Sequence, residues 1–497
     1  MTQPTPPSTS NDPFEINARW VLTPNRFPLA NQTIRVEQGL ITSMKPQQKE
    51  VNNTLHSFNV DFLTPGLINT HTHLDLSGGA PIPKSPDEPM SMWLLKVTES
   101  REATPGKTLA QLTEERCRQG SEKMLQTGVT CVNDITQTNA PFQALEQTGL
   151  RGVVSLEYFH PGYEQLYLDR LFTQYRDQFQ PWQDKPSPHI RIGLSPHAPY
   201  NVSPKAWKAA TKELNPSLIH AHVAECEDER EWLLGIKPNG IDGIHRRFLN
   251  TMFTPQPFPS HSEPSPHSPH SPHSPEWQYI TQHHLLSLHS EHQTEGPETT
   301  PPPTVIAHGS LFTPHDLRAL AQTQSVYLSH CPISNLFLHQ TTLANVPPET
   351  LSRISLGTDS QLSHSTLDLR DDARFACQHH GWSAKTVFHM MTTNAAHTLH
   401  WEDTIGHIQT GYAADLVGWN TPINSPTKTR TEVRTETIQN NAEEENLYQT
   451  WLHPHCTPQY VWVNGKHVFT QQAAQEMEQE ITHNVSKTFA ARKGQSK

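Results

Sequence analysis

The chain of 497 residues has a formal net charge of −12, and hydrophobic residues make up 34% of it. A net negative charge argues against a nucleic-acid partner held by phosphate contacts, and no run reaches the ~20 apolar residues of a membrane span. The polar N-terminus lacks the apolar segment of a signal peptide and the six scattered cysteines form no C-x-x-C pair, so we expect a cytoplasmic protein without a disulfide framework.

Strand-like segments occur near both ends of the chain. Short alternating runs at 18–22 and 33–41 predict a small antiparallel sheet. The pattern returns at 414–419 and on both sides of Asn464-Gly465, a strong hairpin signal. We therefore predict one small composite β-sandwich domain built from both termini, comprising residues 14–62 and 403–472. The flanking segments are a disordered N-terminus (1–13), a loop insert (422–446) and a charged tail (473–497).

The middle of the chain, residues 63–402, alternates strand-like and helix-like segments. The apolar runs predicted to be strands are 63–69, 129–135, 152–158, 190–195, 218–224, 304–308, 325–329 and 353–357. Helical patterns lie between most of them and after the last. Strand–helix alternation implies parallel strands with right-handed crossovers, and eight such units predict an α/β fold, the (β/α)8 TIM barrel. A doubly wound sheet is the alternative, but it would spread the residues discussed below along a wide edge.

Residues 255–303 do not fit the barrel pattern. They include a Ser-Pro-His repeat at 265–275 and a Thr/Pro run that begins at Thr299. Because proline at this density disfavours regular helix, we expect a Pro/His/Ser-rich insert without regular structure between strands five and six. A His-rich segment can bind metal, but a solvated spacer is the simpler interpretation.

The first predicted barrel strand ends in His71-Thr72-His73. Side chains alternate along a strand, so both imidazoles lie on one face and form a pair of zinc-type ligands. A lone His-x-His also occurs on ordinary surfaces. Here further candidates follow at later strand ends, namely His222 with Glu225, His308 and Asp359. This ordered series makes the metal-site interpretation specific.

The fourth and fifth strands add a substrate contact and a third imidazole. His197 lies between two prolines just past strand four, where a histidine can hydrogen-bond a substrate nitrogen; an ordinary loop histidine is the alternative. His220 and His222 share the same strand parity, so either could be the ligand. We favour His222 because barrel sites lie at the carboxyl ends of strands. Glu225 begins the next loop and can reach a metal-bound water.

The sixth and eighth strands complete the set. His308 fits either as a ligand or as an electrostatic partner of a bound hydroxide. Asp359 can bind metal and also accept a proton from water. A divalent ion lowers the pKa of its bound water toward ~7. His308 and Asp359 would then orient the hydroxide while Glu225 moves the proton to the ring nitrogen or the leaving group.

These motifs resemble the amidohydrolase superfamily, in particular the ATZ/TRZ branch with cytosine, methylthioadenosine/S-adenosylhomocysteine, guanine and aminofutalosine deaminases. The resemblance covers residues 14–472 apart from the inserts. The matching segments are 65–73, 195–200, 222–225, 330–335, 356–360 and 411–417.

The resemblance implies metal ligands and catalytic residues one by one. The implied ligands are His71, His73, His222 and Asp359, holding one divalent metal ion, with zinc favoured over iron or manganese. Glu225 is the implied proton shuttle, His308 lies beside the hydroxide and His197 contacts the substrate. The fourth strand, 190–195, contains no lysine that could bridge two metals.

The implied function is an aminohydrolase acting on carbon–nitrogen bonds other than peptide bonds, of the cyclic amidine deaminase type. Metal-hydroxide attack on a ring carbon of a small purine-like or other N-heterocyclic substrate would release ammonia. The segments after His73 and around Trp93 look most like aminofutalosine-deaminase-type sequences, which leaves Glu99, Arg101 and Glu102 open as substrate contacts. The alternatives are a chlorohydrolase or alkylamine hydrolase acting on a triazine-like ring and a non-catalytic metal-binding homologue. A homo-oligomer is compatible with the resemblance.

Overall fold

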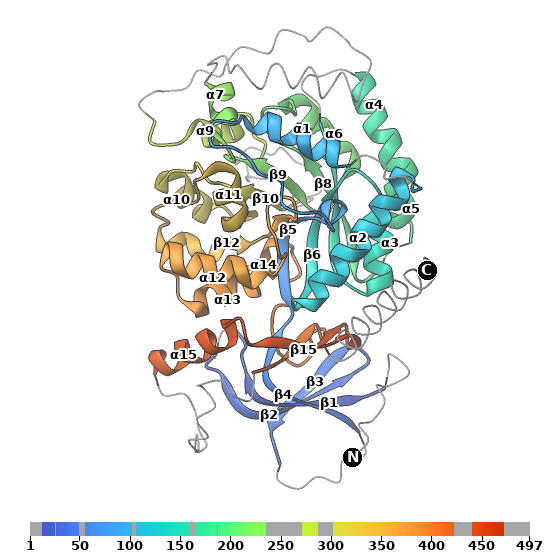
Figure 1. Cartoon of the computed structure of the whole chain (residues 1–497), viewed down its shortest axis with the longest axis vertical. Helices are drawn as coiled ribbons and strands as arrows, with labels where there is room; N and C mark the ends of the chain where they lie inside the picture. Colours follow the sequence, from blue (N-terminus) through green and yellow to red (C-terminus); the bar gives the residue numbers. More distant parts are fainter. Residues whose placement is uncertain are drawn as a thin grey trace, which may run out of the picture. The chain divides into compact units, whose positions relative to one another are not determined.

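The computed structural model describes residues 12–24, 26–48, 55–101, 106–159, 165–185, 187–234, 271–286, 302–421 and 440–471. Two compact units can be distinguished in it (Figure 1). The first comprises residues up to Gly66, Leu125–Thr130 and the residues from Thr404 onward; the second comprises Leu67–Met124 and Cys131–Asp403.

The first unit is built on a seven-stranded mixed sheet with the order β16-β15-β14-β4-β1-β2-β3. Its strands are β1 (Phe14–Val21), β2 (Leu29–Glu37), β3 (Leu40–Pro46), β4 (His56–Pro65), β14 (Leu416–Asn420), β15 (Thr457–Val463) and β16 (Lys466–Thr470). The C-terminal strands join the N-terminal ones where β14 runs antiparallel to β4. Buried and partly exposed residues alternate along the first part of β1, which is the pattern of a half-buried strand. The predicted composite β domain is confirmed.

The second unit contains the barrel. Its sheet has the order β12-β11-β10-β9-β8-β7-β6-β5-β13. The strands are β5 (Leu67–His73), β6 (Val129–Thr136), β7 (Arg151–Tyr158), β8 (Ile190–Pro196), β9 (Ile219–Val223), β10 (Thr304–His308), β11 (Val326–His330), β12 (Ile354–Leu356) and β13 (Asp359–Ser360). Every residue of β6 and β7 is buried, as expected for parallel strands covered by helices.

The eighth barrel strand closes the ring in two short pieces. β12 pairs with β11, while β13 pairs with β5 so that Asp359 lies opposite Thr72. Between the two pieces, the Thr358 amide donates to the carbonyl oxygen of His71 at 3.1 Å. The predicted (β/α)8 barrel is therefore confirmed, and its closure places Asp359 beside the His-x-His strand.

Helices follow most barrel strands and lie around them (Figure 1). They are α1 (Met90–Ser100), α2 (Leu109–Gln126), α3 (Ala140–Thr148), α4 (Gln165–Gln174), α5 (Gln180–Gln183), α6 (Pro204–Leu214), α7 (Glu227–Leu233), α9 (Pro275–Gln282), α10 (Pro314–Gln322), α11 (Pro332–His339), α12 (Leu369–His380), α13 (Ala384–Met390) and α14 (Thr393–Thr398). A further helix, α15 (Asn441–Leu452), belongs to the first unit. Local signals set their ends: Thr313 and Asp316 form a capping box at the start of α10. None of the described helices combines the length and apolarity needed to cross a membrane.

Two expectations about irregular segments are wrong within the described residues. Helix α9 lies inside the Pro/His/Ser-rich insert, starts at a Ser274 cap and buries Trp277 and Ile280. Proline is tolerated in the first turn of a helix, so Pro275 begins this helix rather than forbidding it. Helix α15 begins at Asn441, capped by the side chain of Asn440, so residues 441–446 are helical rather than part of a loop.

Other expectations concern residues outside the described ranges. These are the first eleven residues, the part of the Ser-Pro-His repeat before residue 271, most of the 422–446 insert and the tail 473–497.

Candidate metal and active site

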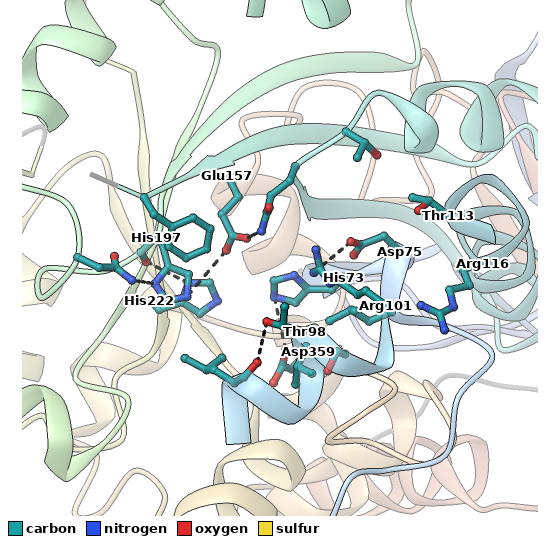
Figure 2. A pocket seen from close by; sticks show the side chains of 18 of the residues that line it. His73, Asp75, Thr98, Arg101, Thr113, Arg116, Glu157, His197, His222 and Asp359 are labelled. Carbon is teal, nitrogen blue, oxygen red and sulfur yellow. Dashed lines mark hydrogen bonds and ion pairs between the residues drawn. The ribbon is translucent and has the colours of Figure 1, made fainter. Parts of the chain in front are cut away.

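A cavity of about 830 Å³ lies at the carboxyl ends of the barrel strands (Figure 2). Side chains from the ends of six strands line it: His73, Glu157, His197, His222, His308 and Asp359. Helices α1 and α2 supply an apolar wall that includes Met90, Trp93 and Val97. Apart from Glu157, these strand-end residues were singled out in the sequence, and they converge on one cavity, as a barrel requires.

Four histidines pack ring against ring at the floor of this site. The ring centroid of His71 lies 5.1 Å from that of His73, 5.0 Å from that of His222 and 5.2 Å from that of His308. Burial lowers the pKa of His71 well below its ordinary value. It lowers the pKa of His222 to about 3, with the nearby His197 adding to the effect. Both rings are therefore neutral near pH 7, the form that binds metal.

The donor set fits a divalent metal ion. Neither ring nitrogen of His71, nor Nδ1 of His73, has a hydrogen-bond partner among the described residues, although all three atoms are buried. Buried polar atoms are normally paired, and buried imidazole nitrogens without a protein partner are suited to binding a metal ion. The ligand atoms of His71, His73 and Asp359 lie within 4.8 Å of one another, as do those of His71, His222 and His308.

His222, rather than His220, belongs to this set. The His222 Nδ1 donates to the carbonyl oxygen of His197 at 3.0 Å, which leaves Nε2 with a free lone pair. His220 lies one strand repeat deeper, opposite Val305, whereas His222 lies opposite Ala307. His220 stacks in parallel on His71 at 4.8 Å and occurs in none of the candidate metal groups of the described residues.

Asp359 turns one carboxylate oxygen toward the histidines and the other toward two serines. Its Oδ1 lies 3.6 Å from Nε2 of both His71 and His73. Its Oδ2 accepts hydrogen bonds from Ser334 Oγ at 2.6 Å and Ser363 Oγ at 2.9 Å. Burial alone would raise the pKa of Asp359, but its contact with His71 holds the pKa well below its usual range. The carboxylate is therefore charged.

Glu225 lies beside His308 and a further histidine on α11. Its Oε1 is 3.8 Å from His308 Nε2 and 3.3 Å from His339 Nε2. Burial would raise the pKa of Glu225, but the electrostatic interaction with His308 and the hydrogen bond with His339 outweigh that effect and lower it. The His308 Nδ1 donates to Asn335 Oδ1 at 2.7 Å, so its Nε2 faces the site. Asn335 holds His308 in this orientation.

Sequence reasoning gave no role to Asn335 and missed His339. The two residues are four positions apart on α11, a spacing that places them on one helix face. Asn335 ends the 330–335 motif, so the four-residue spacing to His339 was the sequence signal that could have identified both residues.

His197 is held in one tautomer by Asn201. The Ala198 amide donates to Asn201 Oδ1 at 3.1 Å, so Asn201 Nδ2 faces His197 Nδ1 at 2.7 Å and donates to it. In the neutral ring the proton is then on Nε2. The His197 Nε2 lies 4.0 Å from Oε1 of Glu157, a buried carboxylate that the sequence did not single out.

Three strand-end residues adopt left-handed backbone conformations. The φ angles are 55° for Ala224, 71° for His308 and 60° for Asp359. Non-glycine residues rarely adopt such angles, and they cluster at functional sites. Here they coincide with the candidate site, since Ala224 directly precedes Glu225 and His308 and Asp359 line the cavity.

The candidate substrate contacts after Trp93 are separated by the structure. Arg101 lines the cavity and pairs with Asp75 at 3.1 Å. Glu99 is absent from the cavity wall formed by the described residues, and Glu102 lies outside them.

Comparisons with known proteins agree with this geometry. A model of the amidohydrolase family matches residues 62–250 and 270–468. The 5-methylthioadenosine/S-adenosylhomocysteine deaminase of Desulfitobacterium hafniense is 27% identical over 379 residues, 72% of each chain. The 5'-deoxyadenosine deaminase of Methanothermobacter thermautotrophicus is 27% identical over 414 residues, 78% of this chain and 82% of that one. The structure of Helicobacter pylori aminofutalosine deaminase superposes with a TM-score of 0.67 at 19% identity, covering 92% of this chain and 100% of that one.

Proposed function

Since the chain belongs to the amidohydrolase family and is a metal-dependent deaminase, we propose that its substrate is a 6-aminopurine nucleoside altered on the 5′ side of the sugar. Both curated relatives described above are named for adenosine derivatives of this kind, which supports the proposal. A cavity of about 830 Å³ leaves room for a nucleoside with a substituent, because small-molecule sites are typically about 300–1,000 Å³.

We propose that His71, His73, His222 and Asp359 hold one divalent ion. The unpaired ring nitrogens of His71 support this assignment, and three imidazoles with one carboxylate suit zinc as well as iron and manganese. Zinc is the ion we expect, because it is common in deaminase-type sites with imidazole ligands. When bound, such an ion acts as a Lewis acid and makes hydroxide available from water near pH 7.

The remaining residues would handle protons and hold the substrate. Deamination consumes one water: its oxygen stays on the ring carbon, one proton ends on the adjacent ring nitrogen and the other leaves with the amine as ammonia. Glu225 would carry these protons through its Oε1, which His308 and His339 face. Asp359 would accept a proton at Oδ1, since its Oδ2 is occupied by two serine hydroxyls. His197 would donate its Nε2 proton to a ring nitrogen of the substrate.

One observation carries this proposal: buried imidazoles from three barrel strands and one charged carboxylate converge, with Asp359 Oδ1 3.6 Å from Nε2 of both His71 and His73. A merely structural histidine cluster would be expected to satisfy its ring nitrogens with protein partners.

The test is ammonia release by metal-loaded protein against a panel of aminated heterocycles. The panel contains 5′-modified adenosines, guanine, cytosine and aminotriazines, with the metal content of each preparation measured in parallel. We expect ammonia from the 5′-modified adenosines and inactivity of the metal-free protein, restored by zinc. Silence across the panel with one metal bound would refute the proposal. Halide or alkylamine release from a triazine would replace it.

A further inference from the structure

The buried carboxylate of Glu157 has fewer partners than its position requires. It lies near the end of β7, lines the cavity and is only 6% exposed. Its Oε2 accepts a hydrogen bond from Gln137 Nε2 at 3.1 Å. Among the described residues, no lysine or arginine lies within ion-pair distance of it, and the nearest histidine nitrogen is His197 Nε2 at 4.0 Å. A carboxylate offers about four acceptor positions, and burying it without donors costs free energy.

His197 and Glu157 present a donor beside an acceptor to the same hollow (Figure 2). The Asn201 side chain fixes the His197 proton on Nε2, and this N–H faces Glu157 Oε1. Their separation of 4.0 Å exceeds a direct hydrogen bond. The pair is therefore spaced to bind two adjacent groups of a ligand, one acceptor and one donor.

A metal ion is the competing occupant, because ligand atoms of Glu157, His197 and His222 lie within 4.8 Å of one another. The tautomer of His197 argues against a metal ion at this position. A neutral His197 that accepts from Asn201 at Nδ1 has no lone pair left on Nε2. His222 has one available nitrogen, which the first metal group already uses.

We propose that Glu157 is a substrate-binding residue that accepts hydrogen bonds from the sugar hydroxyl groups of the nucleoside, beside the ring nitrogen to which His197 donates. The inference rests on the proposed function. The nucleoside portion of such a substrate carries two kinds of donor, the exocyclic amine and the 2′ and 3′ hydroxyls. The amine has to face Glu225 for protonation, so the hydroxyls remain for Glu157. The sugar is attached next to a ring nitrogen, which matches the neighbouring donor and acceptor.

The experiment is a matrix of variants and substrates, in which steady-state ammonia release gives kcat and KM. The substrates are 5′-deoxyadenosine and its analogues that also lack the 2′ or the 3′ hydroxyl. For the wild-type protein, we expect removal of the recognised hydroxyl to lower kcat/KM by roughly tenfold or more, mainly through KM, as for a hydrogen bond to a charged group. In Glu157→Gln, the same removal should change kcat/KM by less than about threefold. Equal ratios in the two proteins would overturn the inference.

Controls separate this role from a structural one. Glu146→Gln makes the same change at an exposed position on α3 and should keep the wild-type ratio. Glu157→Asp keeps the charge but withdraws it by one methylene, so it should raise KM for the parent substrate with near-normal kcat. If Glu157→Gln does not fold, Glu157→Asp carries the test: an unchanged KM and an unchanged substrate ratio would refute the inference.

Two further readouts keep the hypotheses apart. Metal per chain should be the same in wild type and Glu157→Gln; a loss of one equivalent would make Glu157 a metal ligand and overturn the inference. Wild-type protein that releases no ammonia from any nucleoside would refute the proposed function, and the inference would fail with it. Wild-type turnover with no hydroxyl dependence would refute the inference alone.

Discussion

The two serine hydroxyls on Asp359 should control how tightly the site holds its metal. Ser334 Oγ and Ser363 Oγ donate to Asp359 Oδ2 at 2.6 and 2.9 Å, and both serines are buried. They fix the carboxylate so that its Oδ1 points at His71 and His73. Ser363→Ala or Ser334→Ala removes one of these anchors without touching a proposed ligand, so the effect on metal affinity isolates the orientation of Asp359.

The magnitude follows from the strength of the lost contact. A hydrogen bond to a charged acceptor is worth about 1.5–3 kcal/mol, and about 1.4 kcal/mol is a factor of ten in affinity. With one hydroxyl remaining, the carboxylate keeps part of its orientation, so each single variant should weaken zinc binding by roughly tenfold. The double variant should lose roughly 100-fold, within the range typical of groups that orient metal ligands.

The assay is competition for zinc between the protein and a chromophoric chelator, with ammonia release measured at saturating zinc. Ser121→Ala is the matched control, because Ser121 is a buried serine that donates to the Cys117 carbonyl oxygen within α2 and has no contact with Asp359. Unchanged zinc affinity in both single variants and the double variant would refute the reasoning, and with it the orientation of Asp359 as a ligand. Equal losses in Ser121→Ala would reassign the effect to general destabilisation.

Three other changes test separate parts of the site. Glu225→Gln should keep the metal and lower kcat by ~10²-fold or more, as loss of a general acid/base does; turnover near the wild-type rate would remove Glu225 from the mechanism. Gly357→Ala places a Cβ 2.8 Å from both the His71 Cβ and the Ser329 Oγ. Calorimetry should therefore show a decrease of roughly 1–3 kcal/mol in the free energy of unfolding, and zinc affinity should fall. An unchanged melting temperature would contradict the crowding. Burial lowers the pKa of His220 well below its ordinary value, so the unfolded chain binds the extra proton below about pH 6.5 and the metal-free wild type loses stability as pH falls. His220→Leu lacks this imidazole. In urea unfolding, the free energy of unfolding should therefore fall less between pH 7 and pH 5 for the variant than for the wild type; equal decreases would count against a neutral His220.

Local sequence signals were sufficient for the architecture and for most of the candidate ligand set. Strand–helix alternation over residues 63–402 predicts the barrel, and a barrel brings its strand ends together whatever the lengths of the connections. His71, His73, His222, His308 and Asp359 could therefore be named from their places at strand ends. The composite sheet could also be predicted, because strand alternation and the Asn464-Gly465 turn are local sequence patterns.

Helix α9 could not be predicted from local composition. Proline content suggested an irregular insert, but burial of Trp277 and Ile280 stabilises a helix at 275–282. A packed face of this kind depends on partners distant in the sequence, which composition does not record.

The choice between neighbouring candidates depended on tertiary structure. His220 and His222 have the same parity; the sequence favours His222 by its place nearer the strand end, and the structure adds that His220 stacks on His71 while His222 Nδ1 donates to the His197 carbonyl oxygen. The partners of Glu225 and His308 come from α11, which follows β11, two barrel strands after β9 and one after β10. Glu157 became a candidate only when β7 and the loop after β8 brought it within 4.0 Å of His197. Spacing along the chain determines which face a side chain occupies, whereas distances between strands, and hence tautomers, pKa values and ligand sets, arise when the barrel closes.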